Sequence, residues 1–256
     1  MSAKNVKVTV GMPTYNASQT VREAIESVLK QDYDDFELLI VDDASTDGTF
    51  DIVQSYRNDS RVRIYASKKN LGIGATRNRI VKLAKGKYIV PCDNDDLMLA
   101  GHLMRFSGFL DSHPKIGVVY GELLVIEVGK ERQPYILGKD CNKVWDLLSN
   151  SINHPGSMIR KSLIRKVGGY DETVFSVGDW SLWLKLIEIA RFQFLEGEIY
   201  YVYRRGPKSA LRIDKQRLSD EMKLRTHAIK RRYGIQSPSK DVRDNFGNVL
   251  SLLSND

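Results

Sequence analysis

The sequence has few residues of the kinds that crosslink small domains or bind transition metals. It contains two cysteines, Cys92 and Cys141, without a Cys-x-x-Cys pair, so neither a disulfide framework nor a thiolate zinc site is indicated. Its four histidines show no His-x-x-x-His spacing. No stretch approaches the roughly 18 uncharged apolar residues of a membrane span, and the N-terminus lacks the pattern of a cleavable signal. We therefore expect a soluble, cytoplasmic protein with reduced thiols.

The positive charge of the chain is concentrated near its C-terminus. The 256 residues have a formal net charge of +7, but residues 203–243 alone contain 13 Lys and Arg against 4 Asp and Glu. This excess fits nucleic acid, an anionic membrane or a phosphorylated small molecule, and charge alone does not choose among them. An apolar stripe that includes Leu218, Met222 and Ile229 predicts a helix, which either packs on its own domain or lies on a membrane surface.

Strands and helices alternate over the first part of the chain. Periodicity predicts strands at 6–10, 36–41, 61–65 and 87–90, and helices at 17–31, 51–57 and 74–84. This alternation predicts an α/β fold with a mostly parallel central sheet flanked by helices. Thr20 and Glu23 are placed as a capping box for the first helix. Because no linker-like stretch follows, we expect the later strands, around 117–128 and 199–203, to extend the same sheet.

Polar clusters follow three of the predicted strands, at residues 13–16, 42–45 and 93–96. Ligands of open α/β sheets bind beyond the carboxyl ends of the strands, so we expect these clusters to converge on one crevice. Of the neighbouring carboxylates Asp42 and Asp43, one is expected to stabilise the turn before the next helix. The other is then left to bind a nucleobase or a ribose.

Asp93, Asp95 and Asp96 place three carboxylates at the end of a buried strand. Adjacent carboxylates repel one another, and burying them is costly without a compensating cation or solvent. Ligands that are all oxygen favour Mg²⁺ or Mn²⁺, which complete their coordination with waters and substrate phosphates. The alternative is a solvated acidic turn in which Asp96 caps the next helix.

Several other residues have both a local and a functional interpretation. Arg77 follows a glycine-containing turn at residues 72–74, and it either reaches a phosphate or lies on the surface of an amphipathic helix. Asp179 precedes an apolar helix, and it either caps this helix or serves as a general base. Three more residues are either acceptor-side residues or packing residues: His154, Trp180 and Trp183.

Six motifs occur together in one order: PTYNA, VDDASTDGT, NLGIGATRN, KGKYIVPCDNDD, GGYDE and GDWSLWLKL. In this combination, over roughly residues 5–205, the chain resembles the family 2 inverting glycosyltransferases of the GT-A fold. The resemblance implies a single catalytic domain with a Rossmann-like sheet. Its nucleotide-sugar-binding half is expected at residues 1–100, its acceptor-binding and catalytic half at 101–205, and a basic helical tail at 206–256.

The resemblance also implies a reaction and the residues for it. It implies transfer with inversion from a nucleoside-diphospho-sugar, with UDP as the favoured nucleotide, to a saccharide or lipid-linked acceptor in polysaccharide or glycoconjugate synthesis, without nucleic acid. Asp179 is implied as the catalytic base, and Asp93, Asp95 and Asp96 as the DxD-type ligands of Mn²⁺ or Mg²⁺. The implied donor-binding residues are Pro13, Thr14, Tyr15, Asp43, Arg77, Asp93 and Asn94.

The sequence departs from the family pattern after the last expected strand. The family often has an Arg-x-His segment that closes over the diphosphate, whereas here Gly206 stands where the histidine is expected. Either Arg204, Arg205 or Lys208 neutralises phosphate instead, or this segment is a solvated basic loop. Two other functions stay open: a nucleotide-binding module without catalysis, and a membrane-peripheral protein that acts through its basic tail.

Overall fold

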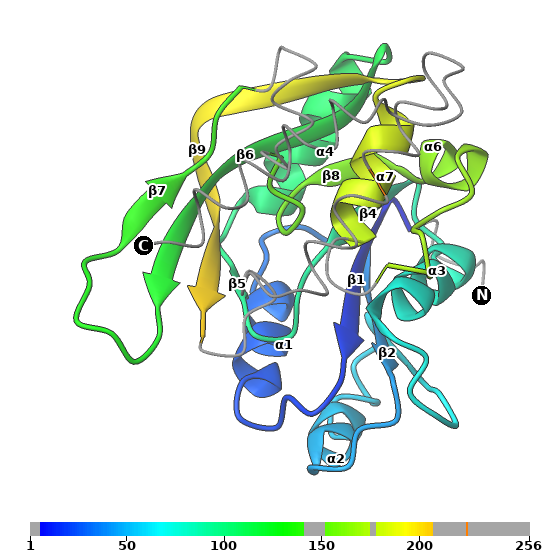
Figure 1. Cartoon of the computed structure of the whole chain (residues 1–256), viewed down its shortest axis with the longest axis vertical. Helices are drawn as coiled ribbons and strands as arrows, with labels where there is room; N and C mark the ends of the chain where they lie inside the picture. The colour runs from blue at the N-terminus through cyan, green and yellow to red at the C-terminus, as the bar shows by residue number, and fades with distance from the viewer. Residues whose placement is uncertain (1–5, 141–151, 175–177, 207–223, 225–256) are drawn as a thin grey trace, which may run out of the picture. The chain divides into compact units, whose positions relative to one another are not determined.

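The structure is a computed structural model that describes residues 6–140, 152–174, 178–206 and Leu224 (Figure 1). Its strands are β1 Val8–Thr14, β2 Phe36–Asp42, β3 Val62–Ala66, β4 Tyr88–Pro91, β5 Leu97–Met98, β6 Ile116–Glu127, β7 Tyr135–Leu137, β8 Met158–Arg160 and β9 Arg191–Arg205. Its helices are α1 Val21–Leu29, α2 Thr49–Gln54, α3 Ile73–Leu83, α4 His102–Ser112, α6 Lys161–Lys166 and α7 Gly178–Leu186.

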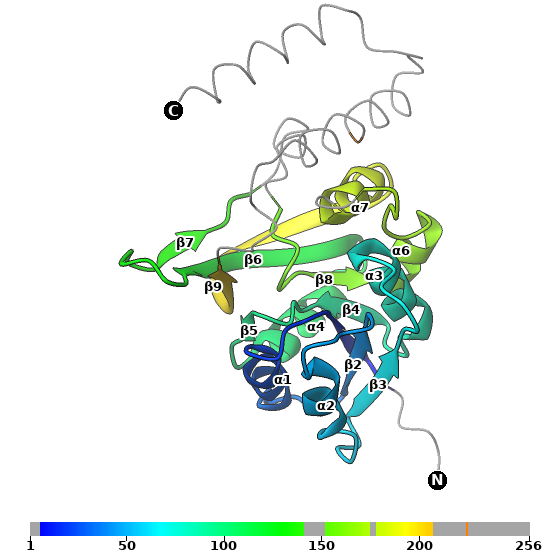
Figure 2. The same ribbon diagram turned by 60° about the horizontal axis from the view of Figure 1, so that its bottom comes forward.

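Within the described residues nine strands form one sheet in the order β3-β2-β1-β4-β8-β6-β9-β5, with β7 paired to β6. The first half of this sheet is parallel, as predicted, because α1, α2 and α3 return the chain between successive strands. Antiparallel pairing enters at β8, and beyond it the long strands β6 and β9 run parallel to each other (Figure 2). The α/β fold class is confirmed, with a sheet that is mixed in its second half.

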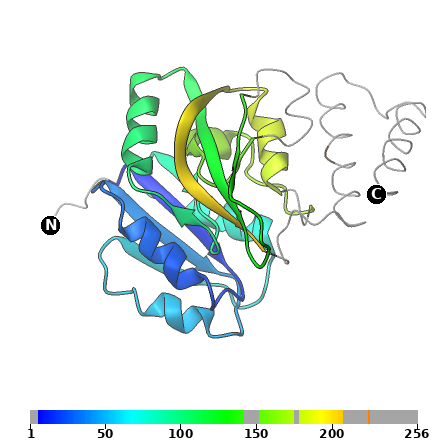
Figure 3. The same ribbon diagram turned by 90° about the vertical axis from the view of Figure 1, so that its left-hand side faces the viewer.

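Helices cover both faces of the sheet (Figure 3). On one face Val8, Val10 and Met12 of β1 pack into a core that includes buried residues of α1 and α4. On the other face α3 lies so close to β1 that a Cβ atom on Gly11 would collide with the Ile80 side chain. Both faces of β1 are therefore buried, which places this strand at the centre of the domain.

Strand β1 runs further toward its carboxyl end than the sequence pattern predicts, and it includes Pro13 and Thr14. Its pairing with β4 ends at Gly11 opposite Pro91, whereas its pairing with β2 continues to Thr14 opposite Asp42. Pro13 therefore lies where β4 no longer pairs with β1, so its missing N–H leaves no ladder bond unmade.

Three local expectations differ from the structure. Helix α4 and the short strand β5 were not expected from the sequence pattern, and β9 begins at Arg191 rather than near residue 199. Gly197, with φ of +72°, interrupts the pairing of β9 with β6, so the strand reads as two segments in the sequence. The capping box is wrong, because the Thr20 hydroxyl donates to the Ala17 carbonyl and makes no cap bond.

The predicted basic tail over residues 206–256 lies outside the described residues, apart from Gly206 and Leu224. Among the helices that are described, none combines the length and the apolar character that a membrane crossing requires.

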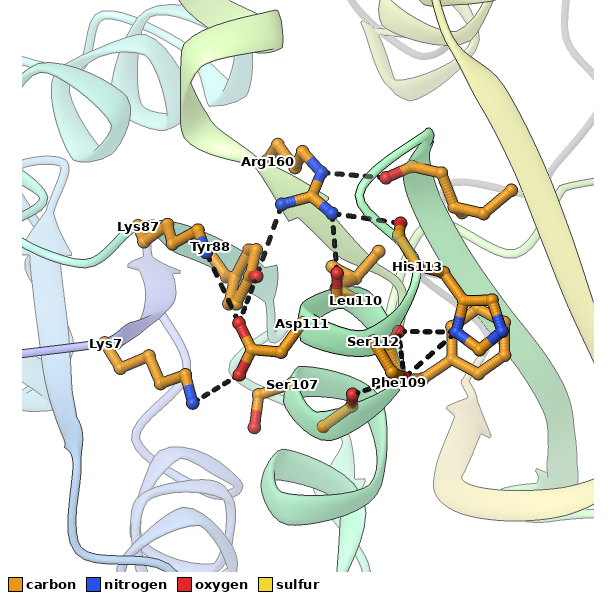
Figure 4. Close-up of polar contacts among 12 residues, drawn as sticks. Lys7, Lys87, Tyr88, Ser107, Phe109, Leu110, Asp111, Ser112, His113 and Arg160 are labelled. Atoms are coloured by element: carbon orange, nitrogen blue, oxygen red, sulfur yellow. Dashed lines mark hydrogen bonds and ion pairs between the residues drawn. The ribbon is translucent and has the colours of Figure 1, made fainter.

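A cluster of charged residues stabilises the end of the sheet at which β1 and β4 begin (Figure 4). Asp111 of α4 accepts a hydrogen bond from the Tyr88 hydroxyl at 2.7 Å and pairs with Lys7 and Lys87. Partial burial of Asp111 by itself raises its pKa, but the bonds from Lys7, Tyr88 and Lys87 outweigh it and lower the pKa to about 2. The cluster thus ties α4 to two parallel strands at the edge opposite their carboxyl ends.

Replacing Asp111 by asparagine is expected to destabilise the fold in a pH-dependent way. Because the folded-state pKa lies below the ordinary 3.8, the stabilisation is present above pH 4 and is lost as the pH falls toward 2. With allowance for solvent screening of this half-buried group, the loss at pH 7 is about 1 kcal/mol. Urea unfolding at pH 7 and pH 3 measures it, with the exposed Asp32→Asn as control. An equal loss at both pH values would contradict the assignment to the Asp111 carboxylate.

Candidate functional site

The polar clusters at the carboxyl ends of β1, β2 and β4 lie together, as predicted. The Asn94 side-chain amide donates to the Pro13 carbonyl at 3.0 Å, which joins the loop after β4 to β1. The Thr14 hydroxyl donates to the Asp42 carboxylate at 2.9 Å, which joins β1 to β2. Asn16 extends this link, because its side-chain oxygen accepts a hydrogen bond from the Thr46 N–H at 2.8 Å. The three clusters therefore form one polar edge.

Asp42 and Asp43 both have hydrogen-bond partners within the chain. Asp42 holds its turn by accepting bonds from the Ser45 N–H at 3.0 Å and the Ser45 hydroxyl at 2.6 Å. Asp43 is buried and accepts bonds from the main-chain N–H groups of Leu71 at 3.0 Å and Gly72 at 2.8 Å. The expectation that one of the pair is left without a partner is therefore not met, since Asp43 fixes the loop that leads into α3.

Tyr15 is the predicted donor residue that is most open to solvent at this edge. It follows directly after β1, and 47% of its surface is exposed, whereas Thr14 is buried. A large exposed aromatic ring beside a polar edge offers a face for stacking. Pro13 is buried within β1 and contributes its carbonyl to the bond from Asn94.

The three carboxylates after β4 have different surroundings. Asp93 accepts a hydrogen bond from the Arg77 guanidinium at 2.9 Å. Burial, together with the charge of Asp93, raises the pKa of Asp95 to about 6. Asp96 is fully buried, one of its oxygens accepts a bond from the Arg204 N–H at 2.9 Å, and the other has no partner. Burial and the charges of Asp93 and Asp95 hold the pKa of Asp96 well above its usual range.

The acidic loop fits a divalent cation through two of its three carboxylates. In the described part of the chain, no group of three or more His, Cys, Asp or Glu side chains is gathered to hold a metal. Asp93 and Asp95 are partly exposed. The raised pKa of Asp95 means that its surroundings disfavour the charged carboxylate, and a hard cation would stabilise that charge. Asp96 differs from the expected third ligand, because it is fully buried and holds the end of the loop to β9.

Arg77 of α3 connects the acidic loop with the predicted base. Burial of its guanidinium works to lower its pKa, but the charges of Asp93 and Asp179, with Tyr170 beside them, outweigh burial and raise it. Asp179 lies in the first turn of α7, in a segment more than 80 residues further along the chain than Asp93. The structure thus brings Asp93 and Asp179 within electrostatic reach of Arg77.

The three residues with open acceptor-side interpretations are packing residues. Trp180 and Trp183 are each 1% exposed, and His154 is 2% exposed. The Trp183 indole donates to the Ile152 carbonyl at 3.2 Å, which satisfies its only polar group.

Arg204 has a role that neither sequence interpretation foresaw. Its guanidinium donates to the Asp95 carbonyl and pairs with Glu23 of α1, and its N–H binds Asp96. It therefore holds the acidic loop against α1 and β9 rather than lying in solvent. Arg205 pairs with Glu127 at 3.7 Å, and Lys208 lies outside the described residues.

Tyr201 of β9 was also missed by sequence reasoning. Its hydroxyl donates to Cys92 Sγ at 3.6 Å and accepts a bond from the Asp93 N–H at 3.1 Å. Its position within the strand expected around residues 199–203 was the only signal in the sequence, and this signal does not indicate the partner.

Comparison with known proteins agrees with this geometry. The model of the family described as Glycosyl transferase family 2 matches residues 9–168. The chain is 33% identical over 186 residues to the "Putative glycosyltransferase EpsE" of Bacillus subtilis, covering 71% of this chain and 67% of the relative. It is 29% identical over 230 residues to the "Uncharacterized glycosyltransferase MJ1057" of Methanocaldococcus jannaschii, covering 86% of this chain and 79% of the relative.

Solved structures show the same fold. The crystal structure of S. aureus TarS 1-349 in complex with UDP-GlcNAc superposes with a TM-score of 0.69 at 26% identity, over 88% of this chain and 67% of that chain. The chain spans 66% of the length of TarS 1-349 in the crystal structure whose name mentions no ligand. The mannosyltransferase PcManGT from Pyrobaculum calidifontis, in complex with GDP-Man and Mn²⁺, shares the fold with a TM-score of 0.63 at 20% identity, over 88% of this chain and 64% of that chain.

Proposed function

Because the chain belongs to glycosyl transferase family 2 and has the GT-A fold, we propose that it transfers a sugar with inversion from a UDP-sugar to an acceptor hydroxyl. The observation that carries this proposal is the position of Arg77, which pairs with Asp93 and lies within electrostatic reach of Asp179. In this proposal the Arg77 guanidinium interacts with Asp93 on the donor side and with Asp179 on the acceptor side.

The donor nucleotide is proposed to bind along the ends of β1 and β2. Tyr15 stacks on the base, while Pro13 and Thr14 shape the floor beneath it. Asp43 keeps the loop at Leu71 and Gly72 in place, and it is proposed to bind the ribose as well. UDP is favoured because the TarS structure at 26% identity contains UDP-GlcNAc.

The donor diphosphate is proposed to lie between the acidic loop and Arg77. Asp93 and Asp95 would hold a Mn²⁺ or Mg²⁺ ion, and Asn94, bound to Pro13, keeps the two carboxylates in register. When bound, the ion neutralises negative charge on the departing diphosphate. Arg77 supplies a second, permanent positive charge at the same place, which stabilises the leaving group as the glycosidic bond breaks.

Asp179 is proposed to act as the base on the acceptor side. It would take the proton of the acceptor hydroxyl while the oxygen attacks the face of the sugar opposite the diphosphate. A single displacement inverts the anomeric carbon and needs one carboxylate on this side, whereas retention through a covalent intermediate needs a nucleophile beneath the sugar. The acceptor class that we propose is a saccharide or a lipid-linked or polymeric glycan, because TarS is named as a poly(ribitol-phosphate) β-N-acetylglucosaminyltransferase.

A panel of UDP- and GDP-sugars with Mn²⁺ or Mg²⁺ tests this function. We expect release of free UDP from at least one UDP-sugar, and loss of this activity when EDTA removes the metal. The GDP-sugars serve as controls for the nucleotide, and the metal-free reaction serves as the control for the ion. Release from GDP-sugars alone would contradict the nucleotide, and unchanged rates in EDTA would contradict the metal.

A further inference from the structure

A buried tyrosine lies against the guanidinium of Arg77. The Cζ atom of Arg77 is 5.8 Å from the centroid of the Tyr170 ring, a distance at which a cation is attracted by an aromatic face. Tyr170 is 4% exposed, so this contact is shielded from water. Arg77 needs such support, because its bond to Asp93 fixes one terminal nitrogen while its Nε atom is buried without a hydrogen-bond partner.

Tyr170 is itself held in two ways. Its hydroxyl is 3.0 Å from His154 Nε2, and the two rings meet edge to face with their centroids 5.6 Å apart. Its main chain is bound to Asn78, the residue next to Arg77 on α3: the Tyr170 N–H donates to Asn78 Oδ1 at 2.8 Å, and Asn78 Nδ2 donates to the Tyr170 carbonyl at 3.0 Å. The preceding residue, Gly169, leaves room for Asn78 because it has no Cβ atom. Tyr170 is therefore placed relative to α3 by both its backbone and its side chain.

Tyr170 and His154 are uncharged, whereas Asp93 and Asp179, whose charges also act on Arg77, are carboxylates. Burial, followed by the charge of Arg77, lowers the pKa of His154 well below its usual range. Burial also raises the pKa of Tyr170. Because these two rings carry no negative charge, they do not compete with Asp93, Asp179 and a diphosphate for the charge of Arg77.

We propose that Tyr170, braced by His154, is a positioning residue that sets the orientation of the Arg77 guanidinium toward Asp93 and Asp179. This inference rests on the proposed role of Arg77 beside the donor diphosphate. Tyr170 touches neither substrate nor reacting atoms in this role, so its effect on transfer passes through Arg77. This role gives a reason for the burial of the Tyr170 and His154 rings against each other.

The direct test observes Arg77 by NMR of the full chain with ¹⁵N-labelled arginine. In the wild type we expect an ordered Nε–H signal for Arg77, assigned by its loss in Arg77→Gln. Tyr170→Leu, which removes the ring, is expected to shift this signal and increase its mobility, and His154→Gln is expected to do so less strongly. The matched controls are Tyr120→Leu and His102→Gln, which alter a buried tyrosine bound to the Lys139 carbonyl and a buried histidine bound to the Gly156 carbonyl. An Arg77 signal that responds to the controls as much as to Tyr170→Leu would overturn the proposal.

The kinetic test is a double-mutant cycle between Tyr170→Leu and Arg77→Gln. In the wild-type background, loss of the aromatic face is expected to lower kcat/KM for the donor roughly 10-fold. In the Arg77→Gln background the same change should lower it less than about 2-fold, because the residue through which it acts is gone. Equal losses in both backgrounds would overturn the positioning role while leaving the proposed function intact. If the wild type released no UDP from any donor, the proposed function would fail, and the NMR experiment would still decide the orientation of Arg77.

Discussion

Replacing Asp179 by asparagine is expected to abolish sugar transfer while leaving donor binding nearly unchanged. The substitution keeps the size of the side chain but removes its capacity to take a proton from the acceptor hydroxyl. A positioned general base contributes about 10²-fold to 10⁴-fold to the rate, so a decrease in kcat within this range is expected. The dissociation constant of UDP in the presence of Mn²⁺ should change by less than about 3-fold, because the role proposed for Asp179 is toward the acceptor and not toward the nucleotide.

A matched control separates this effect from a general change at a helix terminus. Asp51 of α2 is also an acidic residue in the first turn of a helix, and it is exposed. Asp51→Asn removes the same charge from the same kind of position and is expected to retain wild-type turnover. If Asp179→Asn kept wild-type kcat, the base would have to be another group. If the variant lost UDP affinity in proportion to its loss of kcat, Asp179 would belong to the donor site instead.

Local patterns in the sequence predicted the parallel half of the sheet well. Strand β2 begins at Phe36 and β4 ends at Pro91, each within one residue of the predicted bound, because a buried strand between a helix and a polar loop has a clear pattern. The three polar clusters were also placed correctly at one edge, since the carboxyl ends of neighbouring parallel strands must meet there.

The partners of the acidic loop were not predictable from local pattern. Arg204 is 108 residues from Asp96 and 109 from Asp95, and Tyr201 is 108 from Asp93. These contacts exist because β9 returns along the sheet beside β5, and the pattern of residues 191–205 indicates a strand without indicating its neighbour. For the same reason, Tyr170 was part of a family motif in the sequence, while its contact with Arg77 needed the fold.

Neutralising the acidic loop is expected to remove the dependence of UDP binding on metal. In the double variant Asp93→Asn, Asp95→Asn the loop keeps its size and loses both proposed ligand charges. We expect Mn²⁺ to increase UDP affinity about 10-fold or more in the wild type and to have no effect in the variant. Sugar transfer should fall about 10³-fold, which corresponds to the several kcal/mol of charge stabilisation that a bound ion supplies.

The sign of the change without metal distinguishes loss of the ion site from loss of the fold. In the wild type the Asp93 and Asp95 carboxylates repel the diphosphate, and Arg77 is engaged with Asp93. Neutralising both carboxylates removes the repulsion and releases Arg77, so UDP affinity measured in EDTA should rise rather than fall. Asp32→Asn, Asp35→Asn is the charge-matched control, because it neutralises two exposed carboxylates just before β2, at the opposite edge of the sheet. Calorimetry with and without Mn²⁺ measures the UDP affinity of the wild type, the double loop variant and the control. A double loop variant that still binds UDP more tightly with Mn²⁺ would show that the ion is held elsewhere.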